Sequence, residues 1–333
     1  MAEHSPAFIP PGAVGPAEAR ALAERALACR REDAAVLKLT GTGRVACLQG
    51  LVTCDVVKPG DGSHLFGALL TSKGMIVAPL WISRLADAIW IELPADVAPA
   101  VREVFARSLP PRLCRCEDLT PTSAAVGVYG PRAAAALSRV LGVTPPAGAA
   151  AVPYASGVAI VARSVARGLD GWDVLLPVAL VRVFTDDLAS SGTEPGTSAL
   201  LETARILAGI PRLGLEIDER TLPQEVRFEE LGAISYTKGC YLGQETVARI
   251  HFRGHPNRRM VTLALEAAPA APPIELMRGE RSAGRLTSAA WSERDRRWIA
   301  LAVVRRDIAA GTELTLQGGG GASVLGEAAP GEA

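Results

Sequence analysis

The strongest constraint on the fold is a series of three strand-like segments with only short turns between them. Each mixes aliphatic, aromatic and β-branched residues: residues 64–72, 75–84 and 88–94. Segments joined by such short turns pair antiparallel in one sheet. A strand pattern at 35–41 precedes them, and helical spacing occurs at 43–54 and 96–109. The order β-α-β-β-β-α predicts an α+β unit with helices on one face of its sheet.

Two further units follow along the chain. The second α+β unit combines strand patterns with helical ones: strands at 124–129, 158–164 and 171–177, helices at 131–142, 179–190 and 197–209. From residue 258 onward, short alternating runs are separated by Pro, Gly and Ala loops. Such runs predict a small antiparallel β-barrel.

The N-terminal segment shows a helical pattern from Pro16 to Arg31, with Pro in the first turn and two arginines at the end, where cations suit the helix dipole. The expected division of the chain therefore has five parts. These are an N-terminal extension with a helix (1–34), a first α+β unit (35–122), a second α+β unit (123–257), a barrel (258–318) and a flexible tail (319–333).

Composition excludes several classes of partner. The 333 residues are 49% hydrophobic and 21% charged, which is typical of a folded protein. Because 35 Lys and Arg balance 35 Asp and Glu, no global positive field attracts nucleic acid or a membrane, and we expect stable binding to neither. The six cysteines form no CxxC pair, and residues 1–31 lack the apolar core of a secretory signal. We expect a cytoplasmic protein without a stable metal site.

The most specific passage is SYTKGCYLGQETVAR, residues 235–249. Two glycines flank Cys240 and allow a tight turn before a helical pattern that begins near Gln244. Cys240 would then lie near a helix N-terminus and close to Lys238, and both features lower a thiol pKa. The alternative is that Cys240 is a small buried hydrophobic residue, the commoner state of a single cysteine.

The run KGCYLGQETVAR resembles the core motif of the YgfZ family of folate-binding proteins, relatives of the glycine-cleavage T-protein. Residues 39–56 and 68–82 resemble earlier segments of the same family. The resemblance implies an α+β fold of the aminomethyltransferase (T-protein) type, a three-domain ring around a folate-sized hole with a C-terminal antiparallel β-barrel. It also implies binding of tetrahydrofolate or a one-carbon derivative.

Candidate site residues follow from the same resemblance. Cys240 and Lys238 are the candidates for chemical activity. The candidate cofactor-binding residues are Tyr241, Gly243, Gln244, Glu245, Arg249 and Arg205. Glu245 and Arg249 are also spaced for an ordinary i,i+4 helix pair.

Two departures from the T-protein pattern bear on catalysis. T-proteins carry an acidic pair where this chain has Val77 and Ala78, so the general base of aminomethyl transfer is missing and enzymatic activity stays open. A T-protein Glu that reads the pterin corresponds to Leu169. Asp170 or Asp173 are the candidate substitutes.

A second cluster, HFRGHPNRR at residues 251–259, holds three Arg and two His. Such a cluster could grip an anionic tail, such as a folate polyglutamate, or RNA phosphate. The favoured alternative is a solvated linker whose arginines pair with acids such as Glu229 and Glu230.

Three functions are compatible with these features. The preferred one is a folate-binding accessory protein that supports iron-sulfur cluster assembly or repair and iron-sulfur-dependent tRNA modification, with Cys240 as the key reactive residue. Its partners would be folate and iron-sulfur client proteins, including tRNA-modifying enzymes. The alternatives are a folate-dependent aminomethyltransferase and a folate-free protein-binding scaffold.

Overall fold

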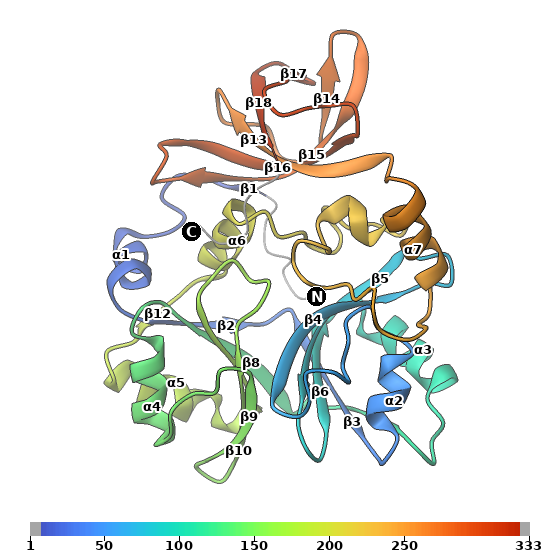
Figure 1. Ribbon diagram of the computed structural model, residues 1–333. Helices are drawn as coiled ribbons and strands as arrows, with labels where there is room; N and C mark the ends of the chain where they lie inside the picture. The colour runs from blue at the N-terminus through green and yellow to red at the C-terminus, as the bar shows by residue number, and fades with distance from the viewer. Residues whose placement is uncertain (1–7, 327–333) are drawn as a thin grey trace.

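The computed structural model describes residues 8–326, which form three β-sheets arranged around a common centre (Figure 1). The sheets have five, six and seven strands. Each sheet has its own hydrophobic cluster, and a further cluster lies where the five-stranded sheet meets the seven-stranded one. This arrangement confirms the expected α+β architecture, with three units around a centre and a C-terminal barrel.

The five-stranded sheet has the order β4-β5-β6-β3-β7. Its strands are β3 (Ala34–Thr40), β4 (Ser63–Leu70), β5 (Ile76–Arg84), β6 (Ile89–Pro94) and β7 (Arg115–Asp118). The helices are α2 (Arg44–Gln49) and α3 (Ala98–Ser108). Phe105 of α3 is fully buried with Leu37 and Ile91 of the sheet, so the predicted apolar pattern builds one core.

The six-stranded sheet has the order β12-β2-β8-β11-β10-β9. Its elements are β2 (Leu27–Arg31), β8 (Ser123–Tyr129), α4 (Ala133–Leu141), β9 (Ala149–Tyr154), β10 (Gly157–Arg163), β11 (Gly171–Pro177), η1 (Val178–Leu180), α5 (Val181–Ser190) and β12 (Glu194–Pro195). Leu137 and Phe184, from the two helices, are buried against its apolar face.

Strand β2 corrects the expected N-terminal helix. The helix α1 (Pro16–Glu24) ends before Leu27, and residues 27–31 form a strand that pairs antiparallel with β8. Leu27, Cys29 and Arg31 alternate inward along this strand, and pairing to a central strand overrides the helix propensity of Ala and Arg. Because β1 (Phe8–Ile9) pairs with a barrel strand, residues 8–34 contribute to two sheets rather than forming a separate extension.

The seven-stranded sheet closes into the barrel through the pairing of β15 with β16. Its remaining strands are β13 (Arg258–Leu265), β14 (Ile274–Arg278), β15 (Arg281–Ser292), β16 (Arg297–Arg305), β17 (Glu313–Leu316) and β18 (Gly321–Gly326). Strand β18 occupies residues that composition assigned to a flexible tail. Its backbone pairs with β13 and β17, which orders a Gly-containing segment; residues 327–333 of that expected tail lie outside the described residues.

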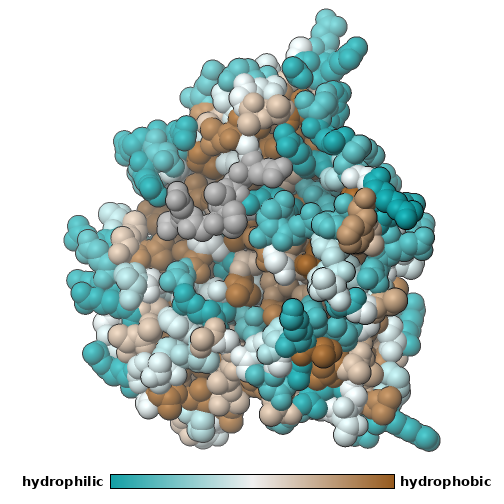
Figure 2. Space-filling model, in the orientation of Figure 1, coloured by the Kyte–Doolittle hydropathy of each residue, from teal (hydrophilic) through white to brown (hydrophobic). Residues whose placement is uncertain are grey.

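The long connection between the second sheet and the barrel passes through the centre of the molecule. It contains α6 (Ser198–Leu207), η2 (Pro223–Val226) and α7 (Gln244–Arg253). Phe228 of this connection packs with Phe66 of β4 and Leu301 of β16, which joins the five-stranded sheet to the barrel. Figure 2 shows polar residues over the outer margins of this face and hydrophobic ones toward its middle.

Candidate functional site

A cavity of about 1120 Å³ lies among the six-stranded sheet, the five-stranded sheet and α6. We call it the central cavity. Its lining includes Arg31, Trp81, Glu92, Tyr129, Arg167 and Arg212. These residues come from β2, β5, β6, β8, the loop after β10 and the segment after α6, so only the assembled ring forms the cavity.

A buried ion network forms one wall of the central cavity. Arg31 donates to both oxygens of Glu92, at 3.0 and 2.5 Å, and to Asp173 at 2.6 Å. Tyr129 donates to Asp173 at 2.8 Å. Burial alone would raise the pKa of Asp173, but the charges of Arg31 and Arg167 outweigh it and hold that pKa far below its usual range. The Asp173 carboxylate is therefore ionised, and the hydrogen bonds hold both carboxylates in place.

Trp81 and Arg167 form a cation-π pair on the same wall. The guanidinium carbon of Arg167 lies 3.6 Å from the centre of the Trp81 ring, and Arg167 also donates to Glu92 at 2.5 Å. The indole nitrogen of Trp81 donates to the carbonyl of Val165 at 2.9 Å, which fixes the ring. The cavity therefore contains a flat aromatic surface beside the Glu92 carboxylate and the guanidinium groups of Arg31 and Arg167.

Arg205 lines the central cavity, but its donors are already engaged. It donates to Glu202 at 3.0 and 2.5 Å, to Glu216 at 3.0 Å and to Ser288 at 2.9 Å. Ser288 belongs to β15, so this buried cluster ties α6 to the barrel. The contacts give Arg205 a structural role in addition to its place on the cavity wall.

The KGCYLGQE motif lies away from the central cavity. Lys238 is buried, and its ammonium donates to the carbonyls of Val52 at 2.7 Å and Cys54 at 2.8 Å. Burial lowers the pKa of Lys238 to about 8. Cys240 is an exposed free cysteine, so the alternative that it is a buried hydrophobic residue is wrong. Neither residue lines the central cavity.

Tyr241, Gly243 and Gln244 shape the turn that leads into α7. Tyr241 is buried, with the Lys238 ammonium 5.0 Å from its ring centre, and its backbone N–H donates to the Gln244 side chain at 3.3 Å. Gly243 has φ +82°, and a Cβ there would lie 2.5 Å from the carbonyl oxygen of Thr71. The turn therefore requires glycine at this position.

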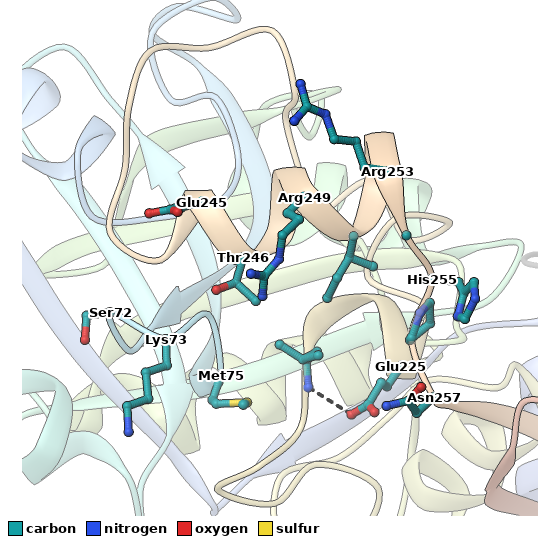
Figure 3. Close-up of a pocket in the computed structure, with 14 residues that line it drawn as sticks. Ser72, Lys73, Met75, Glu225, Glu245, Thr246, Arg249, Arg253, His255 and Asn257 are labelled. Carbon is teal, nitrogen blue, oxygen red and sulfur yellow. Dashed lines mark hydrogen bonds between the residues drawn. The ribbon is translucent and has the colours of Figure 1, made fainter.

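Glu245 and Arg249 line a second, open cavity of about 750 Å³ beside α7 (Figure 3). We call it the α7 groove. Its other polar lining residues include Ser72, Lys73, Thr246, Arg253, His255 and Asn257. Figure 3 shows Arg249 directed from the helix into the groove and Arg253 extended outward. The sequence-derived cofactor residues thus divide, with Arg205 at the central cavity and Glu245 and Arg249 at the α7 groove.

Two family models match the chain. The GCVT N-terminal domain matches residues 13–233, and the glycine cleavage T-protein C-terminal barrel domain matches residues 258–326. The chain belongs to the glycine cleavage T-protein family. The three-unit ring and the C-terminal barrel are therefore family features.

Curated relatives of this T-protein family member carry the name tRNA-modifying protein YgfZ, which confirms the resemblance drawn from the motif. The relative from Cronobacter sakazakii is 29% identical over 314 residues, covering 88% of this chain and 89% of its own length. One from Vibrio vulnificus is 29% identical over 255 residues, covering 76% and 74%. The crystal structure of aminomethyltransferase T from Bartonella henselae shares the fold, with a TM-score of 0.82, 20% identity, and 93% and 88% coverage.

The two departures from the T-protein pattern are visible in the structure. Ala78 is fully buried on β5 and Val77 packs beside the first core, so neither supplies a proton acceptor. Leu169 packs in an apolar cluster near α1. Asp170 pairs with Arg163, whereas Asp173 is buried in the ion network that lines the central cavity.

Sequence reasoning missed the residues that form the wall of the central cavity, including Arg31, Trp81, Glu92 and Arg167. The available signal was a charged residue within an apolar strand, as in IWIELP around Glu92. In the cluster 251–259, Arg258 pairs with Glu225 at 2.9 Å, and His251, rather than an arginine, meets Glu229 at 3.0 Å.

Two features are absent from residues 8–326. None of the helices there is long and apolar enough to cross a membrane. The same residues contain no group of three or more His, Cys, Asp or Glu side chains placed to hold a metal ion.

Proposed function

We propose that this chain is a folate-binding accessory protein of the YgfZ type, which supports iron-sulfur cluster assembly or repair and iron-sulfur-dependent tRNA modification in the cytoplasm. The observation that carries the proposal is the central cavity, a large, partly open space at the centre of a T-protein ring. The curated relatives named tRNA-modifying protein YgfZ support the second part.

The central cavity fits a reduced folate in size and chemistry. Its volume of about 1120 Å³ slightly exceeds the usual range of small-molecule sites, roughly 300–1,000 Å³, so it has room for a ligand as large as a folate. A pterin presents a flat ring with N–H donors, which suits the Trp81 face and the carboxylate of Glu92. The glutamate tail carries carboxylates, which suit a guanidinium such as Arg212, whose longer pairings with Glu202 at 3.4 Å and Asp33 at 3.8 Å the tail would replace.

Tetrahydrofolate, when bound, carries one-carbon units on a pterin ring nitrogen, on the adjacent aminobenzoate nitrogen, or as a bridge between the two. The residues of this chain would bind and orient it. Trp81 would offer stacking surface, and the ion network would hold Glu92 in a fixed position as an acceptor. Because Arg167 covers the Trp81 ring, a pterin stacked on that face must displace the guanidinium.

Aminomethyl transfer of the T-protein type is the alternative that the geometry favours less. At Val77 and Ala78 the side chains offer no general base, and the carboxylates that line the central cavity from β6 and α6, Glu92 and Glu202, are engaged by arginines. A turnover assay with tetrahydrofolate and an aminomethylated carrier protein tests it. Product formation above the uncatalysed rate would establish the enzyme.

Cys240 is the proposed reactive residue because its thiol is exposed at the surface. A stable cluster commonly uses four protein ligands, so Cys240 alone would act transiently, with the cluster held by the client protein. Complementation of a strain that lacks the YgfZ-type protein tests this role, with modified tRNA nucleosides as the readout. Cys240→Ala should fail to restore them, whereas Cys116→Ala, at the other exposed cysteine, should succeed. Normal complementation by Cys240→Ala would remove the role.

Anaerobic calorimetry with mono- and polyglutamylated tetrahydrofolate tests the folate site. We expect saturable binding that Trp81→Ala weakens by about tenfold through loss of stacking. Arg249→Gln is the matched comparison, because the motif suggests it as a folate contact but it lies at the α7 groove. If Arg249→Gln alone lost tetrahydrofolate binding, the folate site would be the α7 groove. If wild type bound no tetrahydrofolate, the folate-free scaffold would be supported instead.

A further inference from the structure

The exposed side of α7 combines cations with an aromatic side chain. Arg249, Phe252 and Arg253 are three and four positions apart, so they share one helix face. The side chain of Phe252 is 67% exposed, the largest value among the big hydrophobic residues of the described chain. Phe252 belongs to none of the described hydrophobic core clusters, and its described ring contacts are edge contacts with Tyr236 and His251.

Phe252 belongs to a small aromatic stack. The Tyr236 and His251 rings lie parallel with centres 3.7 Å apart, and Phe252 meets His251 edge-on at 4.7 Å. The Glu229 carboxylate accepts hydrogen bonds from the Tyr236 hydroxyl and from His251 Nδ1, the latter at 3.0 Å. These two hydrogen bonds hold the stacked rings in place. The exposed Phe252 ring is therefore presented on a rigid support.

The cations beside this stack are not neutralised. Within residues 8–326, Lys73, Arg249 and Arg253 form no ion pair with a carboxylate. The nearby Glu225 is bound by Arg258 at 2.9 Å and by the backbone of Leu222. Glu229 is hydrogen-bonded to the aromatic stack. The remaining carboxylate beside the cations is Glu245, which lies in the first turn of α7 and lines the groove. The surface therefore presents a local positive charge.

We propose that this surface, formed by Lys73, Arg249, Phe252 and Arg253, binds single-stranded RNA. The cations would contact phosphates, and Phe252 would stack on an unpaired base, the combination that single-strand binding surfaces use. An acidic protein segment would use the cations alone and gain nothing specific from an exposed ring. The name tRNA-modifying protein carried by the curated relatives also favours RNA.

The expected interaction is weak and depends strongly on salt. The chain has a formal net charge of zero, so no global field assists a few local contacts. The site is independent of the proposed folate site, because the α7 groove and the central cavity share no lining residue in the described part of the chain. Failure of one proposal therefore leaves the other intact.

Fluorescence anisotropy with a labelled single-stranded RNA of about ten nucleotides tests the proposal. The three cations predict a slope of log K against log salt of about −2. Lys73→Ala and Arg253→Ala should each reduce the magnitude of this slope by about 0.7. Phe252→Ala should weaken binding about tenfold with the slope unchanged, because stacking is not ionic.

Arg182→Ala is the matched control, since it removes one cation from α5, far from α7 in Figure 1, with a side chain that is 93% exposed. It should bind RNA like wild type, and all variants should keep their tetrahydrofolate affinity. The proposal is overturned if wild type shows no saturable binding at low salt, or if Phe252→Ala binds like wild type. Equal or tighter binding of an oligoglutamate of matched charge would overturn it in favour of an acidic protein partner.

Discussion

Arg31 of β2 and Glu92 of β6 form a bidentate ion pair that links the six-stranded sheet to the five-stranded sheet. Side chains of both residues are only 6% exposed. Because Arg31 also binds Asp173 at 2.6 Å, one guanidinium orients two carboxylates beside the central cavity. The pair therefore connects the stability of the ring with the geometry of the proposed folate site.

Glu92→Gln should lower the free energy of unfolding by about 3 kcal/mol, because it leaves two largely buried guanidinium groups, those of Arg31 and Arg167, to share Asp173 as their ionic partner. Glu194→Gln is the matched control, since Glu194 pairs with Arg25 at 3.1 Å on the surface. Its cost should stay below about 1 kcal/mol. Urea unfolding measures both. Equal effects of the two substitutions would contradict a special role for the buried pair.

The cysteines should separate clearly in a native alkylation experiment. Burial raises the pKa of Cys29 and of Cys54 to about 12, so both remain protonated thiols out of reach of reagent. Cys240 and Cys116 are exposed. Burial of its thiol raises the pKa of Cys116 to about 11, so iodoacetamide at neutral pH should modify Cys240 first and Cys29 and Cys54 last, as read by peptide mass spectrometry. Early modification of Cys54 would show that the Lys238 region opens in solution.

Lys238 should make the stability depend on pH in the alkaline range. Burial lowers its pKa from 10.5 to about 8 in the folded protein, so the unfolded chain binds more protons between these values. Stability rises with pH wherever the unfolded state binds more protons. Between about pH 8 and 10.4, wild type should therefore gain stability relative to Lys238→Met, by at most about 3 kcal/mol. A constant difference across this range, measured by urea unfolding, would contradict the lowered pKa.

Gly243→Ala should destabilise the turn before α7, because φ +82° is unfavourable for alanine and its Cβ would meet the Thr71 carbonyl at 2.5 Å. We expect a cost of about 2 kcal/mol. Gly239→Ala is the matched control within the same motif, since nothing lies within 4 Å of a Cβ there. Its effect should stay within about 0.5 kcal/mol. Thermal unfolding compares the two, and similar melting temperatures would show that the turn tolerates a side chain at Gly243.

Several elements could be predicted from local pattern alone. The segments 64–72, 75–84 and 88–94 form β4, β5 and β6, because alternation and short turns are properties of neighbouring residues. Strands β9 and β18 escaped prediction. The sequence of β9 is AAAVPY, and β18 begins and ends with Gly, so neither has a strong intrinsic strand preference. Their pairing with distant strands creates them.

The KGCYLGQE run carried the family resemblance, and it correctly predicted a tight turn before a helix at Gln244. The run could not reveal that Lys238 is buried against the carbonyls of Val52 and Cys54. Nor could it show that Glu245 and Arg249 face a groove separate from the central cavity. Because Cys240, Glu245 and Arg249 are close in sequence, the motif suggested one shared site. In the structure, α7 carries Glu245 and Arg249 to the α7 groove, whereas Cys240 is exposed outside it.

The residues by themselves determined the fold class, most strands and helices, and the family, since these depend on periodicity, turn chemistry and a near-continuous motif. Only the tertiary structure decided the location of the central cavity. Its wall brings together Arg31 and Glu92, with Asp173 bound to Arg31 behind them, and the three residues are distant in sequence and lie on three different strands. Such groups meet because burying a charge is favourable only with a partner, and the partners are supplied by the packing of two sheets.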